Sequence, residues 1–309
     1  MTMTMTTITH LQPHLQQARA LASLVQQALL DEVTLTPKPG LVDLRSRGAH
    51  RDLNWALMCH SAVALRPTFE AMAEAGLAGL PQDLLRQRIG RLGRVGEAVM
   101  LTVTGGVNTH RGAIWALGLL ITAAGQQLAA GQPLTPAALA ARAGALARIK
   151  DAGAPARTGN KGEAARLRYH VGGASGQAQA DFPHVTQVSL PALQEARRQG
   201  ATETAARLQS LLAIVAELDD TCVLARGGPG ALAQVQAGAS AVLAAGGLTT
   251  RAGSAALVQL EHTMLALNVS PGGAADLLAA TLLLDRLQRL QHLQHHQPDT
   301  DTEDSHGTT

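Results

Sequence analysis

The chain has 309 residues, enough for about two average domains, although one large helical domain would also have an ample core. Apolar residues make up 46% of it and aromatic residues only 2%, so Leu, Ala, Val and Ile must build the core, which favours closely packed helices. The formal net charge is +2 and the arginines are spread along the sequence, which argues against a nucleic-acid partner.

The cysteines and the two ends indicate a protein of the reducing cytoplasm. Cys59 and Cys222 lie in apolar runs without CxxC spacing, as buried free thiols do. We expect neither a signal peptide nor a membrane span, because residues 1–10 lack a basic head and an apolar core and no later run of about 18 apolar residues lacks charge or glycine. The predicted organisation is a disordered tail over 1–10, an all-helical catalytic domain over 11–290 and a disordered polar tail over 291–309.

Helical periodicity dominates the chain and predicts an all-α fold, a single multi-helix domain with glycine-rich loops that form the active site. The expected helices cover residues 12–33, 52–75, 81–101, 112–130, 136–149, 201–219, 231–245, 251–267 and 274–290. The best strand candidate, 182–190, is short and flanked by prolines. Residues 151–182 have no clear period and are expected to be a long irregular excursion.

The first junction between helices runs from Glu32 to Asp43. Pro37 and Pro39 prevent the helix from continuing and fix an extended, stiff loop around Lys38. Ionisable groups follow densely, namely Asp43, Arg45, Arg47, His50 and Asp52. This density indicates a polar site, with a solvated surface loop as the alternative.

The second junction is Thr104-Gly-Gly-Val-Asn-Thr-His-Arg-Gly112. Asn108 or Thr109 can cap the helix that begins near His110, and free N–H groups at such a start attract anions. His110 and Arg111 then lie in the first turn. A glycine-softened helix junction without function is the alternative.

Two further junctions carry a polar load. In the segment 268–276, Ser270 is the expected helix cap, Pro271 the first helical residue, and Asp276 lies about a turn and a half inside. In the segment 219–228, Asp219 and Asp220 are paired carboxylates at an expected helix end, where the helix dipole disfavours them. Such a pair favours the binding of a counter-ion such as Mg²⁺. The alternative is two solvated acids at a frayed helix end.

The sequence contains no GxxxxGK[ST], GxSxG or HExxH motif. Four of its segments, in this order and at this spacing, resemble the triphosphoribosyl-dephospho-coenzyme A synthases over about residues 21–290. These segments are TPKPGLVDLRSRGAHRDL, TGGVNTHRGAIWALGLL, DDTCVLARGG and SPGGAADLLAATLLLD. The stretches GAHRDLNWALMCHSAVALRPTFEAM and NTHRGAIWALGLL are more similar to the malonate decarboxylase branch than to the citrate lyase branch. One departure is Ser175-Gly-Gln177, where relatives tend to have Arg-Gly-Glu.

The resemblance implies an all-helical, Mg²⁺-dependent enzyme that joins C1 of the ATP ribose to a ribose hydroxyl of 3′-dephospho-CoA and releases adenine. Its product would be the precursor of the prosthetic group on the acyl carrier protein of malonate decarboxylase, upstream of which the enzyme would act. A homodimer is compatible with the alanine-rich helices. The alternatives are a Mg²⁺-dependent helical nucleotide or ADP-ribosyl hydrolase, and a non-catalytic helical scaffold.

Such a reaction has an oxocarbenium-like transition state and sets three tasks: clamping the triphosphate, assisting the departure of adenine and deprotonating the attacking hydroxyl. The candidates for acid and base are Glu32, Asp43, Asp52 and His110. The candidates for substrate and ATP binding are Lys38, His50, Gly105, Gly106, Asn108, Thr109, Arg111, Arg226, Ser270, Gly272, Gly273 and Asp276. The glycines are expected to act through backbone N–H groups, and Asp219 and Asp220 are expected to hold Mg²⁺. In our working hypothesis a carboxylate from residues 32–52 activates the hydroxyl while His110 contacts ATP.

Overall fold

The computed structural model describes residues 5–295, and in this range every regular element is a helix, which confirms the all-α prediction. The first half contains α1 (Met5–Thr34), α2 (Trp55–Ala64), α3 (Arg66–Leu77), α4 (Gln82–Val103), α5 (Arg111–Ala129) and α6 (Pro136–Arg148). The second half contains α7 (Lys161–Tyr169), α8 (Gly173–Gln179), a π-helix (His184–Ser189), α9 (Leu190–Arg198), α10 (Glu203–Glu217), α11 (Thr221–Ala244), a short 3₁₀-helix (Gly247–Thr249), α12 (Arg251–Ala266) and α13 (Gly272–His295).

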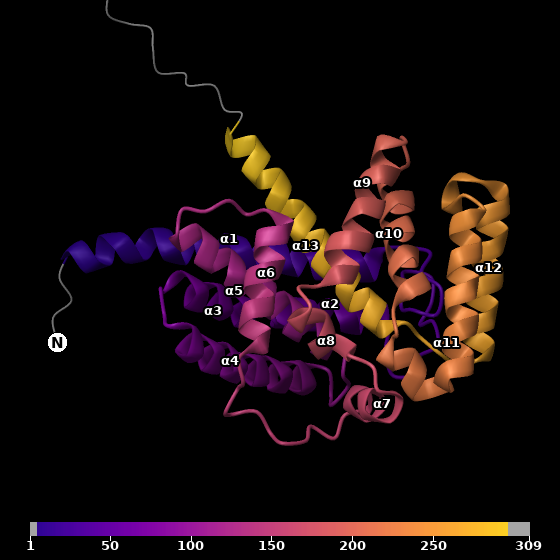
Figure 1. Cartoon of the computed structure of the whole chain (residues 1–309), viewed down its shortest axis with the longest axis horizontal. Coiled ribbons are helices and arrows are strands. Elements are labelled where there is room, and N and C mark those ends of the chain that lie inside the picture. Colours follow the sequence, from indigo (N-terminus) through magenta and orange to yellow (C-terminus); the bar gives the residue numbers. More distant parts are fainter. Residues whose placement is uncertain (1–4, 296–309) are drawn as a thin grey trace, which may run out of the picture.

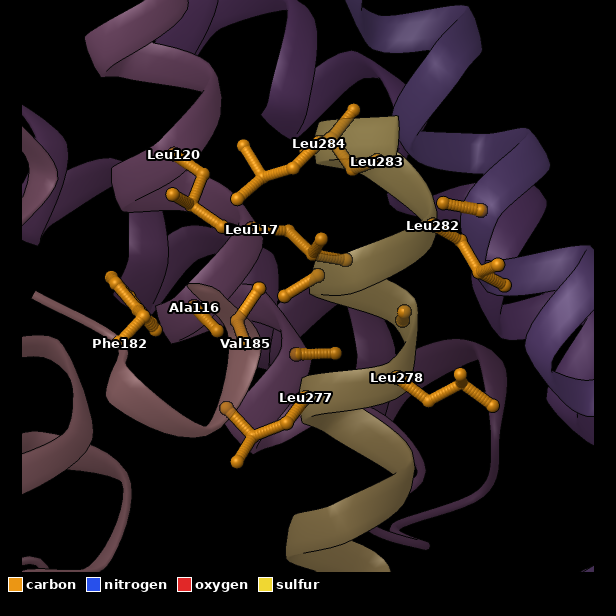
Figure 2. Packing of buried hydrophobic residues seen from close by; sticks show 14 of the residues in the cluster. Ala116, Leu117, Leu120, Phe182, Val185, Leu277, Leu278, Leu282, Leu283 and Leu284 are labelled. Atoms are coloured by element: carbon orange, nitrogen blue, oxygen red, sulfur yellow. The ribbon is translucent and has the colours of Figure 1, made fainter. Parts of the chain in front are cut away.

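Helix α5 lies at the centre of the larger group of helices, where it packs on α1, α3, α4, α6 and α13 (Figure 1). It lies closest to α3, because Gly76 and Gly125 leave room between the two backbones: a Cβ at Gly76 would lie 2.2 Å from the carbonyl oxygen of Thr122. Helix α13 packs on α5 through leucines such as Leu277 and Leu284 (Figure 2). By length and composition α5 is the one helix in the described range that could cross a membrane, but 78% of its apolar window is buried inside the fold.

Helices α10, α11 and α12 stand beside this group, and α7 packs on α11 (Figure 1). Helix α11 is kinked at Gly228, whose backbone angles (φ 70°, ψ −172°) lie in a region that only glycine adopts without strain. Pro229 begins the second half of the helix. The first half, which starts at Thr221, therefore runs in a different direction from the second half.

Several boundaries differ from the sequence-based expectations. The helix expected over 52–75 is two helices, because the backbone turns at Leu65 and Pro67 starts α3. The excursion expected over 151–182 contains α7 and α8, and the strand candidate over 182–190 is mostly π-helical. Helix α1 begins before the expected domain start at residue 11, α13 continues past 290, and the remaining tail residues 1–4 and 296–309 lie outside the described range.

Candidate active site

The starts of α11 and α13 converge on one buried carboxylate, that of Asp220, which is 3% exposed. Its Oδ1 accepts the Cys222 N–H at 2.7 Å, and its Oδ2 accepts the Ala274 N–H of α13 at 2.9 Å. The N–H groups of Val223 and Gly273 also bond to it. Burial raises the pKa of Asp220 despite these four donors. One aspartate thus caps two helices, so it lies at a helix start and not at the disfavoured helix end expected from the sequence.

Asp276 lies where α13 meets the start of α5. A Cβ built on Gly112 would lie 2.0 Å from Oδ2 of Asp276, so this carboxyl group occupies the space that a side chain at position 112 would need. It accepts the N–H of Ala113. Burial raises the pKa of Asp276 well above its usual range, and the nearby negative charges of Glu32 and Asp220 raise it further.

Lys38 is the buried cation beside these acids. Its Nζ lies 2.5 Å from Oε1 of Glu32 and 2.6 Å from the Glu32 carbonyl oxygen, and the two side chains are 1% and 5% exposed. The stiff proline loop turns Lys38 back onto the end of α1, where the helix C-terminus also favours a cation. We call Glu32, Lys38, His110, Asp220 and Asp276 the polar cluster.

Asp43 organises the loop that carries Lys38. Its Oδ2 accepts the Lys38 N–H at 3.1 Å, and its Oδ1 accepts the N–H groups of Arg45 and Ser46 at 2.8 and 2.9 Å. Arg45 also pairs with it and with Glu261 of α12. Because these donors hold both oxygens, the geometry favours a structural role for Asp43 over the expected acid–base role.

His110 brings an open ring nitrogen to the polar cluster. It is 3% exposed, and its Nδ1 lies 2.9 Å from Oγ of Ser61, which in turn lies 2.7 Å from Oγ1 of Thr109. Its Nε2 has no protein partner among the described residues. Burial, with the charge of Lys38 adding, lowers the pKa of His110 to about 4, so the ring is neutral near pH 7. Ser61 was not anticipated, because a serine inside an apolar helix carries no sequence signal.

A second histidine links the first and third junctions. The Arg226 guanidinium lies 3.1 Å from Nδ1 of His50, and His50 Nε2 lies 2.9 Å from Oγ of Ser270. Because arginine can only donate, Nδ1 accepts and Nε2–H donates to Ser270. Burial first, then Arg226, lowers the pKa of His50 to about 4, and the charge of Asp52 partly opposes this. Arg226 also donates to the Ala49 carbonyl oxygen, so α11 fastens the loop.

The expected phosphate clamp of glycine N–H groups does not match these contacts. Gly105 and Gly106 have positive φ values and end α4, their N–H groups donating to the carbonyl oxygens of Thr102 and Leu101 in a helix-terminating motif. The Gly272 N–H donates to the Ser270 carbonyl oxygen, and Gly273 bonds to Asp220. Ser270 therefore does not cap α13 with its side chain, since Asp220 does so.

The remaining candidates lie at the rim. The N-cap position of α5 is His110 and not Asn108 or Thr109, although the side chain of Asn108 accepts the Arg111 N–H at 3.2 Å. Arg111 pairs with Glu97 of α4 at 3.0 Å. Asp52 is exposed and does not cap α2, because Asn54 does so through the Leu57 N–H.

The expected Mg²⁺ pair does not converge in space. Asp219 is exposed, whereas Asp220 is buried and already accepts four N–H groups. Within residues 5–295 no three His, Cys, Asp or Glu side chains are grouped so that they could hold a metal ion. The Mg²⁺ site therefore stays a prediction, and Asp219 is the member of the pair with free oxygens.

The comparisons with known proteins agree with the motifs around this cluster. The family model for ATP:dephospho-CoA triphosphoribosyl transferase matches residues 18–295. The chain belongs to this family. A 2-(5″-triphosphoribosyl)-3′-dephosphocoenzyme-A synthase of Klebsiella pneumoniae is 54% identical over 86% of this chain and 94% of its own.

Other relatives are similarly close. Probable synthases of the same name from Azotobacter vinelandii and Pseudomonas syringae pv. syringae are each 54% identical, over 89% and 88% of this chain and 94% and 92% of their own. No solved structure matches the chain.

Breaking the buried ion pair should destabilise the fold. We expect Lys38→Met to lower the free energy of unfolding by about 3–5 kcal/mol, because it leaves Glu32 charged and unpaired. The double variant Lys38→Met/Glu32→Gln should lose less than the sum of the two single variants. Urea unfolding measures the free energy of unfolding of the two single variants and of the double variant. Strict additivity would show that the pair does not interact as described.

The stability should also depend on the neutrality of His110. Its pKa is lower in the folded chain than the usual 6.5, so the folded state binds fewer protons, and stability is lost as the pH falls from about 6.5 towards 4. In the His110→Gln variant the free energy of unfolding should fall by up to about 3 kcal/mol less than in the wild type over this pH range. Unfolding curves between these pH values measure it, with the exposed His60→Gln as the matched control. Equal pH dependence of wild type and His110→Gln would contradict the assignment.

Proposed function

We propose that this protein transfers the triphosphoribosyl group of ATP to 3′-dephospho-CoA, releasing adenine and making 2′-(5″-triphosphoribosyl)-3′-dephospho-CoA. The support is the 54% identity to relatives bearing the name of this synthase. The polar cluster offers chemistry that suits the reaction, since carboxylates beside a developing oxocarbenium ion stabilise its positive charge.

The residues of the cluster divide the tasks. Glu32 is held by Lys38, which leaves Asp276 as the carboxylate whose raised pKa gives it a higher affinity for the hydroxyl proton than an ordinary aspartate has. As the bond from C1 of the ribose to the adenine nitrogen breaks, its electron pair leaves with adenine. A bond from the acceptor hydroxyl oxygen to C1 forms, and Asp276 takes up the hydroxyl proton. Adenine takes up one proton from solvent as it leaves, and Asp276 returns the hydroxyl proton to solvent after the transfer, so the proton count balances.

His110 contacts the ATP moiety in this scheme, as in the working hypothesis from the sequence. Its neutral ring offers Nε2 to one polar atom of the nucleoside, while Ser61 fixes the orientation of the ring through Nδ1. The buried Nε2 supports this role, because a buried polar atom without a partner costs about 1–3 kcal/mol.

Mg²⁺ is proposed as the companion of the triphosphate. It typically uses one or two carboxylates together with substrate phosphate oxygens, so a group of three protein ligands is not required. Of the expected pair, the exposed Asp219 fits as a ligand and Asp220 does not, since its oxygens hold the starts of α11 and α13. When bound, the ion neutralises phosphate charge.

The direct test is product analysis by mass spectrometry. The purified protein should release adenine from ATP only when 3′-dephospho-CoA is present, and chelation of Mg²⁺ should stop the release. Asp276→Asn should lower kcat by about 10²–10⁴-fold, as loss of a proton-transfer group does. Asp52→Asn, at an exposed position, is the matched control and should stay near the wild-type rate. Phosphate or ribose phosphate released from ATP alone would instead identify the nucleotide hydrolase alternative.

We propose further that the product serves the acyl carrier protein of malonate decarboxylase and not that of citrate lyase. The support is the motif likeness around residues 48–72 and 108–120. Deletion of the gene in its host should abolish malonate decarboxylation, and the wild-type gene should restore it. Loss of citrate cleavage alone would assign the enzyme to the other branch. The expected cytoplasmic location and homodimer remain predictions.

A further inference from the structure

Charge is distributed very unevenly along this nearly neutral chain. Residues 82–168 contain 12 Lys and Arg but only 4 Asp and Glu, whereas the whole chain has 25 and 23. The rest of the protein is therefore acidic overall. Such an asymmetry indicates a surface that meets an anion, although the spread of arginines along the sequence hides it.

Part of this excess lies on α4, on the segment 149–160 that starts against α4, and on α7, into which the segment leads. Gln87 of α4 donates to the Lys150 carbonyl oxygen at 2.9 Å and accepts the Ala152 N–H at 2.8 Å. Arg94 of α4 pairs with the buried Asp151 at 2.6 Å. The start of the segment is thus fastened to α4.

Most cations of this surface have no protein partner. Arg88, Arg91, Lys150, Arg157 and Lys161 are exposed and have no ion pair, hydrogen bond or ring contact, and we call them the basic surface. Arg166 and Arg168 of α7 are exposed too, but Arg166 acts on Glu163 and Arg168 lies over the Tyr169 ring. The neighbouring acids cannot neutralise them, because Asp151 pairs with Arg86 and Arg94, and Glu97 pairs with Arg111.

Two further acids lie in the same part of the chain. Glu163 accepts from Thr158 and Gly159 at the start of α7, in a helix-capping arrangement. Asp83 lies at the far end of α4, in its first turn. The basic surface is therefore an uncompensated field of positive charge.

The basic surface borders the polar cluster on two sides. Helix α7 packs on the start of α11, where a Cβ built on Gly162 would lie 3.6 Å from the side chain of Thr221, the residue after Asp220. On the other side, Arg111 at the start of α5 is tied to Glu97 of α4. Anions held on the basic surface therefore lie beside the residues that would act on them.

We propose that the basic surface binds the polyphosphate groups of the substrates and guides them to the polar cluster. The inference rests on the proposed function for the identity of the ligand, since ATP and dephospho-CoA both carry phosphate chains. The polar cluster itself is rich in buried carboxylates and would repel such anions. A separate cationic surface beside it resolves this conflict, because long-range attraction raises the local concentration of a charged substrate.

The test compares two charge reversals of equal size. The variant Arg157→Glu/Lys161→Glu alters the basic surface. The matched control Arg66→Glu/Arg251→Glu makes the same change in net charge at exposed cations of α3 and α12 that have no ion pair or hydrogen bond. Titration calorimetry with inorganic tripolyphosphate should show affinity reduced about tenfold or more in the first variant at low ionic strength, and nearly unchanged affinity in the control.

Kinetics supply the second measurement. In the first variant the KM for ATP should rise about tenfold with kcat within twofold of wild type, and the difference should shrink at roughly 0.5 M salt, where exposed charges are screened. Equal effects of both double variants would overturn the proposal, since only net charge would then matter. A fall in kcat without a change in tripolyphosphate affinity would overturn it too. Because the calorimetry needs no turnover, it tests the surface even if the transferase assay fails.

Discussion

The structure depends on the capping of two helices by one buried aspartate. Asp220 accepts N–H groups from its own helix α11 and from α13, which is separated from it by more than fifty residues of chain. Helix starts carry partial positive charge, so two of them can hold a carboxylate in the interior that neither could hold alone. This contact fixes where α11 and α13 begin, and with them Arg226 and Asp276.

The other buried charges follow from that arrangement. Asp276 lies against the start of α5 and feels both Asp220 and Glu32, so a third acid in the same place needs a cation. Lys38 supplies it from a loop that two prolines stiffen and Asp43 ties together. Burial, with the charge of Lys38 adding to it, lowers the pKa of His110 and keeps the ring neutral. A site with more acids than bases in its interior thereby remains compatible with a folded protein.

Composition and periodicity were sufficient to predict the helical fold, because alanine and leucine at three- and four-residue spacing have few other packings. The four glycine- and proline-rich junctions were also a sound guide, since Lys38, His110, Asp220 and Asp276 do come together. The roles within the junctions were harder to predict. Gly105 and Gly106 were expected to offer free N–H groups to phosphate, whereas their N–H groups bond to carbonyl oxygens at the end of α4, a contact that the glycine pattern alone does not reveal.

Long-range partners were beyond the reach of sequence reasoning. Asp220 was expected at a helix end because its own neighbours suggested one, and its second helix comes from a distant segment. Ser61 and the fastening of the loop by Arg226 depend on which faces of α2 and α11 meet the junctions. The uneven charge was visible in the sequence, but only the structure shows that the segment after α6 is fastened to α4 at Lys150 and Ala152.

Gly112 shows how a missing side chain can determine the chemistry of another residue. The Asp276 carboxyl group occupies the place of its absent Cβ, so even a methyl group at position 112 would push that carboxyl group away from the start of α5. Asp276 would then lose its hydrogen bond from the Ala113 N–H, and its distance from Glu32 would change. Both contacts contribute to its proton affinity, so that affinity would change as well. The proton affinity of Asp276 is in this sense encoded at position 112, in a residue that can carry no charge of its own.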